Sequence, residues 1–146
     1  MSSLTWRQRL ARKLLTKTVA DRRAGPVGGP VEWLEDRITP DAYQWTHGGA
    51  NTNWDNPANW TVTAGPGALG YPNAAGDVAQ FTAAIGTAQT VTVNAAFTVG
   101  EIDFGAADAY ALAAGGGSVT FNNGGSAAVL SVTAGNAAAD SIAAPV

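Results

Sequence analysis

Short runs in which large apolar side chains alternate with small or polar ones fill the sequence from residue 77 onward. A period of two residues places every second side chain on the same face of a β-strand. One face of each run would therefore be apolar and buried, while the other would carry Thr, Ser or Ala. Segments rich in Gly, Asn and Ala separate the runs and supply turns. The pattern predicts an all-β protein with strands at 77–82, 90–94, 97–104, 109–113, 118–121, 129–133 and 141–144.

The alternation also predicts which side chains form the core. The expected buried pairs are Val91 and Val93, Tyr110 and Leu112, Val119 and Phe121, and Leu130 and Val132. Within 97–104 the alternation changes phase at Gly100, where a bulge or a corner is expected.

Two architectures accommodate such strands, a β-solenoid and a two-sheet sandwich. The segments between strands are built from small residues, as in Gly115-Gly-Gly117, Gly124-Gly125 and Ala137-Ala-Ala139. Small residues suit tight corners that stack on one another, with the strands about 4.8 Å apart. The sequence therefore favours the solenoid.

Charge is distributed very unevenly along the 146 residues. All eight basic residues lie between Arg7 and Arg37, whereas residues 41–146 contain seven acidic residues and no Lys or Arg. This change near residue 40 indicates a domain boundary. A body without cationic side chains cannot neutralise phosphates, so nucleic acid is not an expected partner of residues 41–146.

Residues 1–23 form a basic leader, and residues 24–40 form a Pro/Gly linker that ends in Leu34-Glu-Asp-Arg-Ile-Thr-Pro40. The leader is expected to be partly helical or disordered. It fits a solvated tail, a segment for export or for a membrane surface, or a nucleic-acid arm. No run of 18 apolar residues occurs, so no transmembrane helix is expected. The chain has no cysteine, which excludes disulfides and thiolate chemistry.

No arrangement of residues indicates an active site or a metal site. A catalytic triad needs a histidine, and His47 lies alone in a turn-like segment, where we expect it to be solvated. Asn51, Asn53 and Asp55 have the alternate spacing of a calcium loop, but the residues such a loop needs further along are absent. Glu101 and Asp103 are expected on a solvated strand face. We therefore expect no enzyme, no catalytic or metal-binding residue and no cofactor.

Three tryptophans crowd into sixteen residues: Trp45, Trp54 and Trp60. If they are exposed, their rings could stack on sugars and bind a polysaccharide. If they are buried, they would pack as a cap that shields the first turn of a solenoid, which such folds require. Both interpretations stay open at this point, and the cap is favoured.

Several motifs occur in a recognisable order between residues 43 and 146: Tyr43-Gln-Trp45, Asn53-Trp54, Asn59-Trp60, Gly76-Asp77-Val78, Val91-Thr-Val93, Phe97-Thr-Val99, Ile102-Asp-Phe104 and Ser131-Val-Thr133. In this order they resemble the autotransporter-associated β-strand repeat and the Trp-rich module that precedes it. The segment Leu34–Pro40 resembles the LEDR-x-x-P leader of large secreted proteins of planctomycete-type bacteria.

The resemblance implies a right-handed β-helix, with a capping module at 41–82 and solenoid rungs at 83–146. It also implies a secreted or cell-surface protein with a structural or adhesive role. Family members are usually longer, so further rungs would be expected after Val146. An uncapped last rung would expose a sheet edge and invite self-association.

Overall fold

The computed structural model describes residues 39–133 and 139–146. These residues belong to one compact unit, 37–146, whereas a separate unit, 1–36, lies outside the described residues. The predicted basic leader and the linker up to residue 38 therefore also lie outside them. Within the described part of the chain, no helix is long and apolar enough to cross a bilayer.

The described residues form ten short strands and one 3-10 turn, which confirms the all-β prediction. The elements are β1 (Ala42–Trp45), η1 (Pro57–Asn59), β2 (Trp60–Ala64), β3 (Val78–Phe81), β4 (Gln89–Val93), β5 (Ala96–Val99), β6 (Glu101–Phe104), β7 (Tyr110–Ala114), β8 (Ser118–Phe121), β9 (Val129–Val132) and β10 (Ser141–Ile142). The alternation did not predict β1 or β2. The run expected at 97–104 is two strands, β5 and β6, separated at Gly100.

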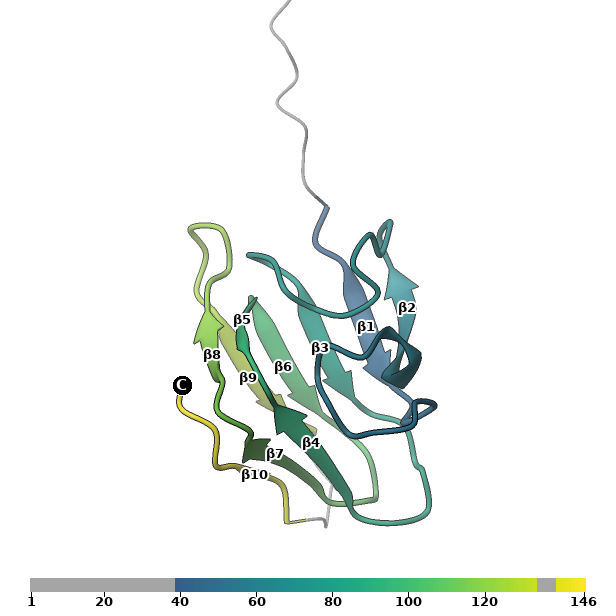
Figure 1. Ribbon diagram of the computed structural model, residues 1–146. Helices are drawn as coiled ribbons and strands as arrows, with labels where there is room; N and C mark the ends of the chain where they lie inside the picture. The colour runs from purple at the N-terminus through teal and green to yellow at the C-terminus, as the bar shows by residue number, and fades with distance from the viewer. Residues whose placement is uncertain (1–38, 134–138) are drawn as a thin grey trace, which may run out of the picture. The chain divides into compact units, whose positions relative to one another are not determined.

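The strands pair in three sheets (Figure 1). The first has the order β2-β1-β3-β6-β9, the second β10-β7-β4 and the third β5-β8. All neighbours are parallel except β1 and β2, which are antiparallel. Parallel strands need a long crossover, and in this chain the crossover from β3 to β6 consists of β4 and β5, which belong to the other two sheets.

Apolar side chains stack in register along each sheet. Phe81 pairs with Phe104 and Phe104 with Val132, while Val91 pairs with Leu112 and Leu112 with Ile142. Burial alternates along most strands, so these positions point toward a common core while their neighbours face outward. Trp45, Phe81, Val91, Ile102, Tyr110 and Leu112 are all fully buried.

The backbone turns sharply at Gly100, between β5 and β6. A Cβ atom at this position would lie 2.6 Å from the Cα atom of Gly76. The two backbone segments can approach this closely only because neither residue carries a side chain. The bulge or corner predicted at Gly100 is thus a bend between β5 and β6, at a position where the neighbouring turn leaves no room for a side chain.

One end of the sheets, which we call the closed end, is covered by residues 41–76. Strand β2 pairs with β1 at the edge of the first sheet. Residues 52–54 lie beside β4 in the second sheet: Trp54 N–H donates to the Thr92 carbonyl (2.9 Å) and Thr92 N–H donates to the Thr52 carbonyl (2.7 Å). In the third sheet, Thr98 N–H donates to the Asn73 side chain (2.9 Å). Each sheet thus finds partners for its first parallel strand at this end.

At the opposite end, which we call the open end, β9 and β10 are the outermost strands. Leu130 and Val132 pair with the buried Ile102 and Phe104, yet they are 55% and 59% exposed. The prediction that they are buried is wrong, because no further strand of the described residues covers their inward-facing side chains.

Candidate functional site

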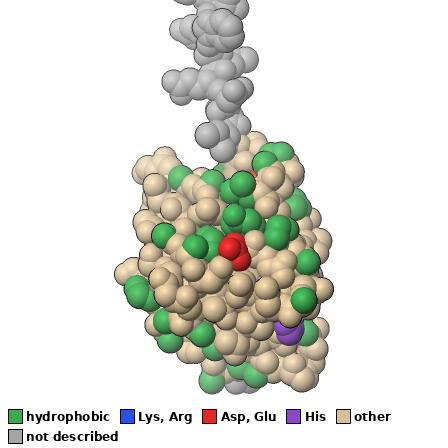
Figure 2. Space-filling model, in the orientation of Figure 1, with side chains coloured by type: hydrophobic (Ala, Val, Ile, Leu, Met, Phe, Trp, Pro, Cys, Tyr) green, Lys and Arg blue, Asp and Glu red, His purple; other side chains and the backbone are tan. Residues whose placement is uncertain are grey.

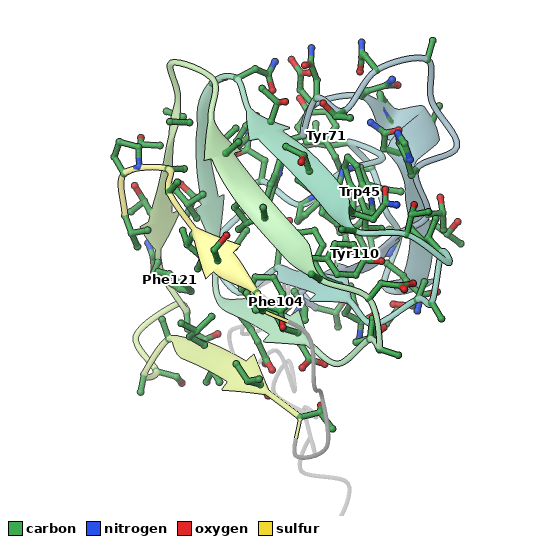
Figure 3. The ribbon with its side chains drawn as sticks, turned by 90° about the horizontal axis from the view of Figure 1, so that it is seen from below. Trp45, Tyr71, Phe104, Tyr110 and Phe121 are labelled. Carbon is green, nitrogen blue, oxygen red and sulfur yellow. The ribbon has the colours of Figure 1, made fainter. Side chains whose placement is uncertain are left out.

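The three tryptophans lie together at the closed end. Trp45 ends β1, Trp60 begins β2, and Trp54 lies in the loop that joins them. Trp45 and Trp54 are completely buried and Trp60 is 6% exposed. We call this group, together with Phe81 and Phe97, the tryptophan cluster. In Figure 3 the labelled Trp45 lies among the strands, on the same side as Tyr71 and Tyr110.

Aromatic contacts connect every member of the tryptophan cluster. Trp60 meets both Trp45 and Trp54 edge-on, with ring centroids 5.1 Å apart in each case. Trp54 stacks on Phe97 at 5.4 Å, and Phe81 contacts all three tryptophans at 5.6–6.4 Å. These separations are those of favourable aromatic pairs. The cluster joins the loop and β1–β2 to β3 and β5.

The three indole N–H groups differ in how they are satisfied. Trp54 Nε1 donates to the Pro72 carbonyl (2.9 Å), and Trp60 Nε1 donates to the Trp54 carbonyl (2.7 Å). Trp45 Nε1 is buried and has no hydrogen-bond partner among the described residues. Two indoles therefore fix loop positions through hydrogen bonds, while Trp45 contributes by packing alone.

Asparagine side chains hold the loop between β1 and β2. Asn59 is fully buried, and its amide group donates to the carbonyls of Asn51 and Asn53 (both 2.9 Å) while accepting from Gly49 N–H (2.9 Å). Asn51 closes a turn by accepting from Asn53 N–H (3.1 Å). Asn56 caps η1 by accepting from Ala58 N–H. These contacts account for the Asn spacing that the sequence shows.

This arrangement bears directly on sugar binding. A sugar platform needs an exposed ring face, and Trp45, Trp54 and Trp60 are each packed between other aromatic rings and the strands. The geometry favours a cap that fills the core at the closed end over a surface on which sugars stack.

A network of two carboxylates and a phenol lies beside the tryptophan cluster. The buried Asp77 accepts from the backbone N–H groups of Asp41 (3.1 Å) and Asn73 (3.0 Å), and Tyr43 donates its hydroxyl to Asp41 (3.0 Å). Burial, and then the hydrogen bond and charge of Asp41, raise the pKa of Tyr43 above its ordinary value. Burial and the nearby carboxylates likewise raise the pKa of Tyr110 to about 12. Both phenols therefore stay protonated near neutral pH.

Acidification is expected to stabilise this network. Burial raises the pKa of Asp77 above 3.8, although its backbone hydrogen bonds oppose the shift. The folded chain therefore binds this proton more tightly than the unfolded chain. The stabilisation is complete below the unfolded pKa and is lost as pH rises through the folded pKa. Urea midpoints measured from pH 4 to 7 should thus fall with rising pH.

The variant Asp77→Asn separates this effect from general charge repulsion. It removes the titrating group, so its urea midpoint should change less between pH 4 and 7 than that of the native chain. An equal pH dependence in both proteins would show that Asp77 does not cause it.

The other polar residues that the sequence raised as site candidates do not form one site. His47 is exposed, as expected, with a φ of 52°, and its ring stacks against Trp45 at 6.2 Å. Glu101 and Asp103 share one strand face but are half-buried rather than solvated, and one oxygen of Asp103 lacks a hydrogen-bond partner. Among residues 39–133 and 139–146, no three His, Cys, Asp or Glu side chains are grouped as a metal site would need.

The open end carries an apolar hollow of about 280 Å³. Its lining residues come from three strands and the segment before β10: Phe104, Leu130, Val132, Asp140, Ser141 and Ile142. Phe104 lies toward this end in Figure 3. Sequence reasoning missed the hollow because Leu130 and Val132 have the pattern of core residues.

The face of the molecule drawn in Figure 2, in the orientation of Figure 1, shows hydrophobic side chains around a small acidic patch and no basic side chain.

Compared with known proteins, the chain matches no protein-family model, no curated protein and no solved structure.

Proposed function

We propose that the chain is a non-enzymatic structural or adhesive module of a secreted or cell-surface protein, built as the N-terminal part of a β-solenoid. The proposal rests on one observation: from β3 onward, each strand pairs in parallel with the strand three positions later in the chain. These pairs are β3 with β6, β6 with β9, β4 with β7, β7 with β10, and β5 with β8. Successive turns of a solenoid stack in this way. Parallel crossovers are almost always right-handed, and the passenger-type β-helices that the sequence resembles are right-handed, so the coil we propose is a right-handed one.

The closed end supports the role of residues 41–82 as a cap. Solenoids need a terminal unit that satisfies the first sheet edges and shields the core. Strand β2, residues 52–54 and the Asn73 side chain bond the first strands of the three sheets. The tryptophan cluster fills the core beneath them. Residues 83–146 then supply the rungs.

A structural role also agrees with the titratable side chains of residues 41–146. Residues 41–146 offer no Lys or Arg for an anionic substrate, and the buried phenols have raised pKa values. Secretion or surface display rests on the resemblance to passenger-type β-helices. The alternative, a carbohydrate-binding module that uses Trp45, Trp54 and Trp60, requires those rings to become exposed.

Tryptophan fluorescence distinguishes the two functions. In the full chain with Trp6→Phe and Trp33→Phe, emission comes only from the tryptophan cluster. We expect blue-shifted emission that iodide does not quench and that a panel of polysaccharides leaves unchanged, because all three rings are buried. Red-shifted, quenchable emission that one polysaccharide protects would replace the cap with the carbohydrate-binding module.

A further inference from the structure

Residues 122–127 form the turn that joins β8 to β9. Ser126 N–H donates to the Asn123 carbonyl (3.0 Å), and the Asn123 side-chain amide donates to the Ala127 carbonyl (2.9 Å). The two residues that follow Asn123 are exposed glycines, and both have positive φ angles. A Cβ atom at either glycine would meet no neighbouring atom within 4 Å. The tip of this turn is therefore surrounded by open space.

Asn123 is the only asparagine in the sequence that precedes a glycine. Asparagine is among the thermolabile residues, because the backbone nitrogen of the next residue can attack its side-chain carbonyl carbon. A side chain on the next residue hinders this attack, and a proline there has no N–H to lose. Every other asparagine is followed by Thr, Trp, Pro, Ala or Asn. Asn123 thus combines the least hindered neighbour with a turn that leaves room for a ring.

We propose that Asn123 is a site of spontaneous covalent modification, at which the chain converts its own amide into a carboxylate. The Gly124 nitrogen loses its proton and bonds to the side-chain carbonyl carbon of Asn123, and ammonia leaves. The product is a five-membered succinimide ring, formed by an intramolecular reaction between adjacent residues.

Water then opens the succinimide ring at one of its two carbonyl carbons. Opening on the backbone side gives isoaspartate, whose main chain runs through the former side chain, and opening on the other side gives aspartate. Water is the only co-reactant in the sequence of steps. The inference does not depend on the proposed cell-surface role.

The position of Asn123 determines what the modification does to the fold. Its side-chain oxygen lies against the corner at Gly100, where an added Cβ atom would be 2.9 Å from it. Its side-chain N–H groups supply the donor to the Ala127 carbonyl. A carboxylate has no such donor, so acceptor oxygens would face each other. Residues 41–146 contain no Lys or Arg to neutralise the new charge. The modification should therefore loosen the turn that leads into β9.

Mass spectrometry of the full chain tests the reaction. The folded chain is incubated at mildly alkaline pH, where the attacking nitrogen loses its proton more readily, and is then digested with chymotrypsin. Cleavage after Phe121 and Leu130 releases the peptide 122–130, which contains two asparagines. Asn123 should lose its amide and give both aspartate and isoaspartate, the latter detected by isoaspartyl methyltransferase. Asn122, the more exposed of the two, should keep its amide. An unchanged peptide, or equal conversion of both asparagines, would overturn the proposal.

A matched pair of variants tests the structural consequence. Asn123→Asp installs one of the two products and should lower the urea midpoint, because the Ala127 carbonyl loses its donor. Asn122→Asp adds the same charge one residue away but keeps an oxygen that can accept from Gly124 N–H (3.0 Å). Its midpoint should therefore stay close to that of the native chain. Equal midpoints for the two variants would show that the modification does not loosen the turn.

Discussion

Replacing Trp54 with Ala should lower the free energy of unfolding by about 3–5 kcal/mol, the usual loss for a buried tryptophan. Trp54 is fully buried, stacks on Phe97 and contacts Trp60. Its removal leaves a cavity at the closed end and separates the loop from β5. A loss of this size is a large part of the 5–15 kcal/mol that typically stabilises a domain. Urea denaturation followed by circular dichroism measures it.

The conservative pair Trp54→Phe and Trp45→Phe isolates the contribution of the indole hydrogen bond. Both variants keep an aromatic ring, but only Trp54→Phe leaves a buried acceptor, the Pro72 carbonyl, without its donor. An unsatisfied buried group costs about 1–3 kcal/mol. Trp45→Phe instead removes an N–H that has no partner. Trp54→Phe should therefore be the more destabilising variant by about that amount, and equal losses would show that the hydrogen bond contributes nothing.

Replacing Gly117 with Ala should destabilise the protein by about 3 kcal/mol or more, at or beyond the upper end of ordinary overpacking. Gly117 lies just before β8, and a Cβ atom there would be 2.0 Å from the carbonyl oxygen of Ala95 and 2.4 Å from its nitrogen. The obstructing atoms are backbone, so rotation of a side chain cannot relieve the clash. Thermal unfolding monitored by circular dichroism should show a markedly lower midpoint.

Gly105→Ala is the matched control for Gly117→Ala. The atoms nearest to its Cβ would belong to the side chains of Thr133 and Thr82, both at 3.1 Å, and these side chains can rotate away. The change in stability should therefore be about 1 kcal/mol or less in either direction. If both variants lose the same stability, general loss of glycine flexibility rather than backbone contact would be responsible.

The alternation in the sequence located the strands of the body well, because one face of each is buried and the other is not. It missed β1 and β2 for different physical reasons. Tyr43 and Trp45 alternate correctly, but the run has four residues and sits among turn-forming side chains. Strand β2 also alternates, with Trp60, Val62 and Ala64 apolar, but it is short and follows directly on the turn at 57–59, and only Trp60 of its apolar residues is buried. Its place at the sheet edge comes from its pairing with β1.

The candidate site could be predicted only in part from the sequence. The crowding of Trp45, Trp54 and Trp60 predicted a cluster, but the same crowding suits an exposed platform or a buried plug. Burial is a property of the tertiary fold, and the residues that impose it are distant: Phe81, Phe97 and the Pro72 carbonyl. Asn59 and Asp77 occur in the motifs of the resemblance, but nothing in the sequence marked them as buried, because a buried polar residue becomes recognisable only when its partners are in place.

The sequence separation between paired strands has a consequence for how the chain folds. Val78 pairs with Glu101 and Glu101 with Val129, and from β3 onward each pair of neighbouring strands closes a loop of about 20–30 residues. The entropy lost in each closure is therefore similar from one strand to the next. We therefore expect folding to begin at the tryptophan cluster and to advance strand by strand in chain order. Each strand that has docked then offers its edge to the next strand.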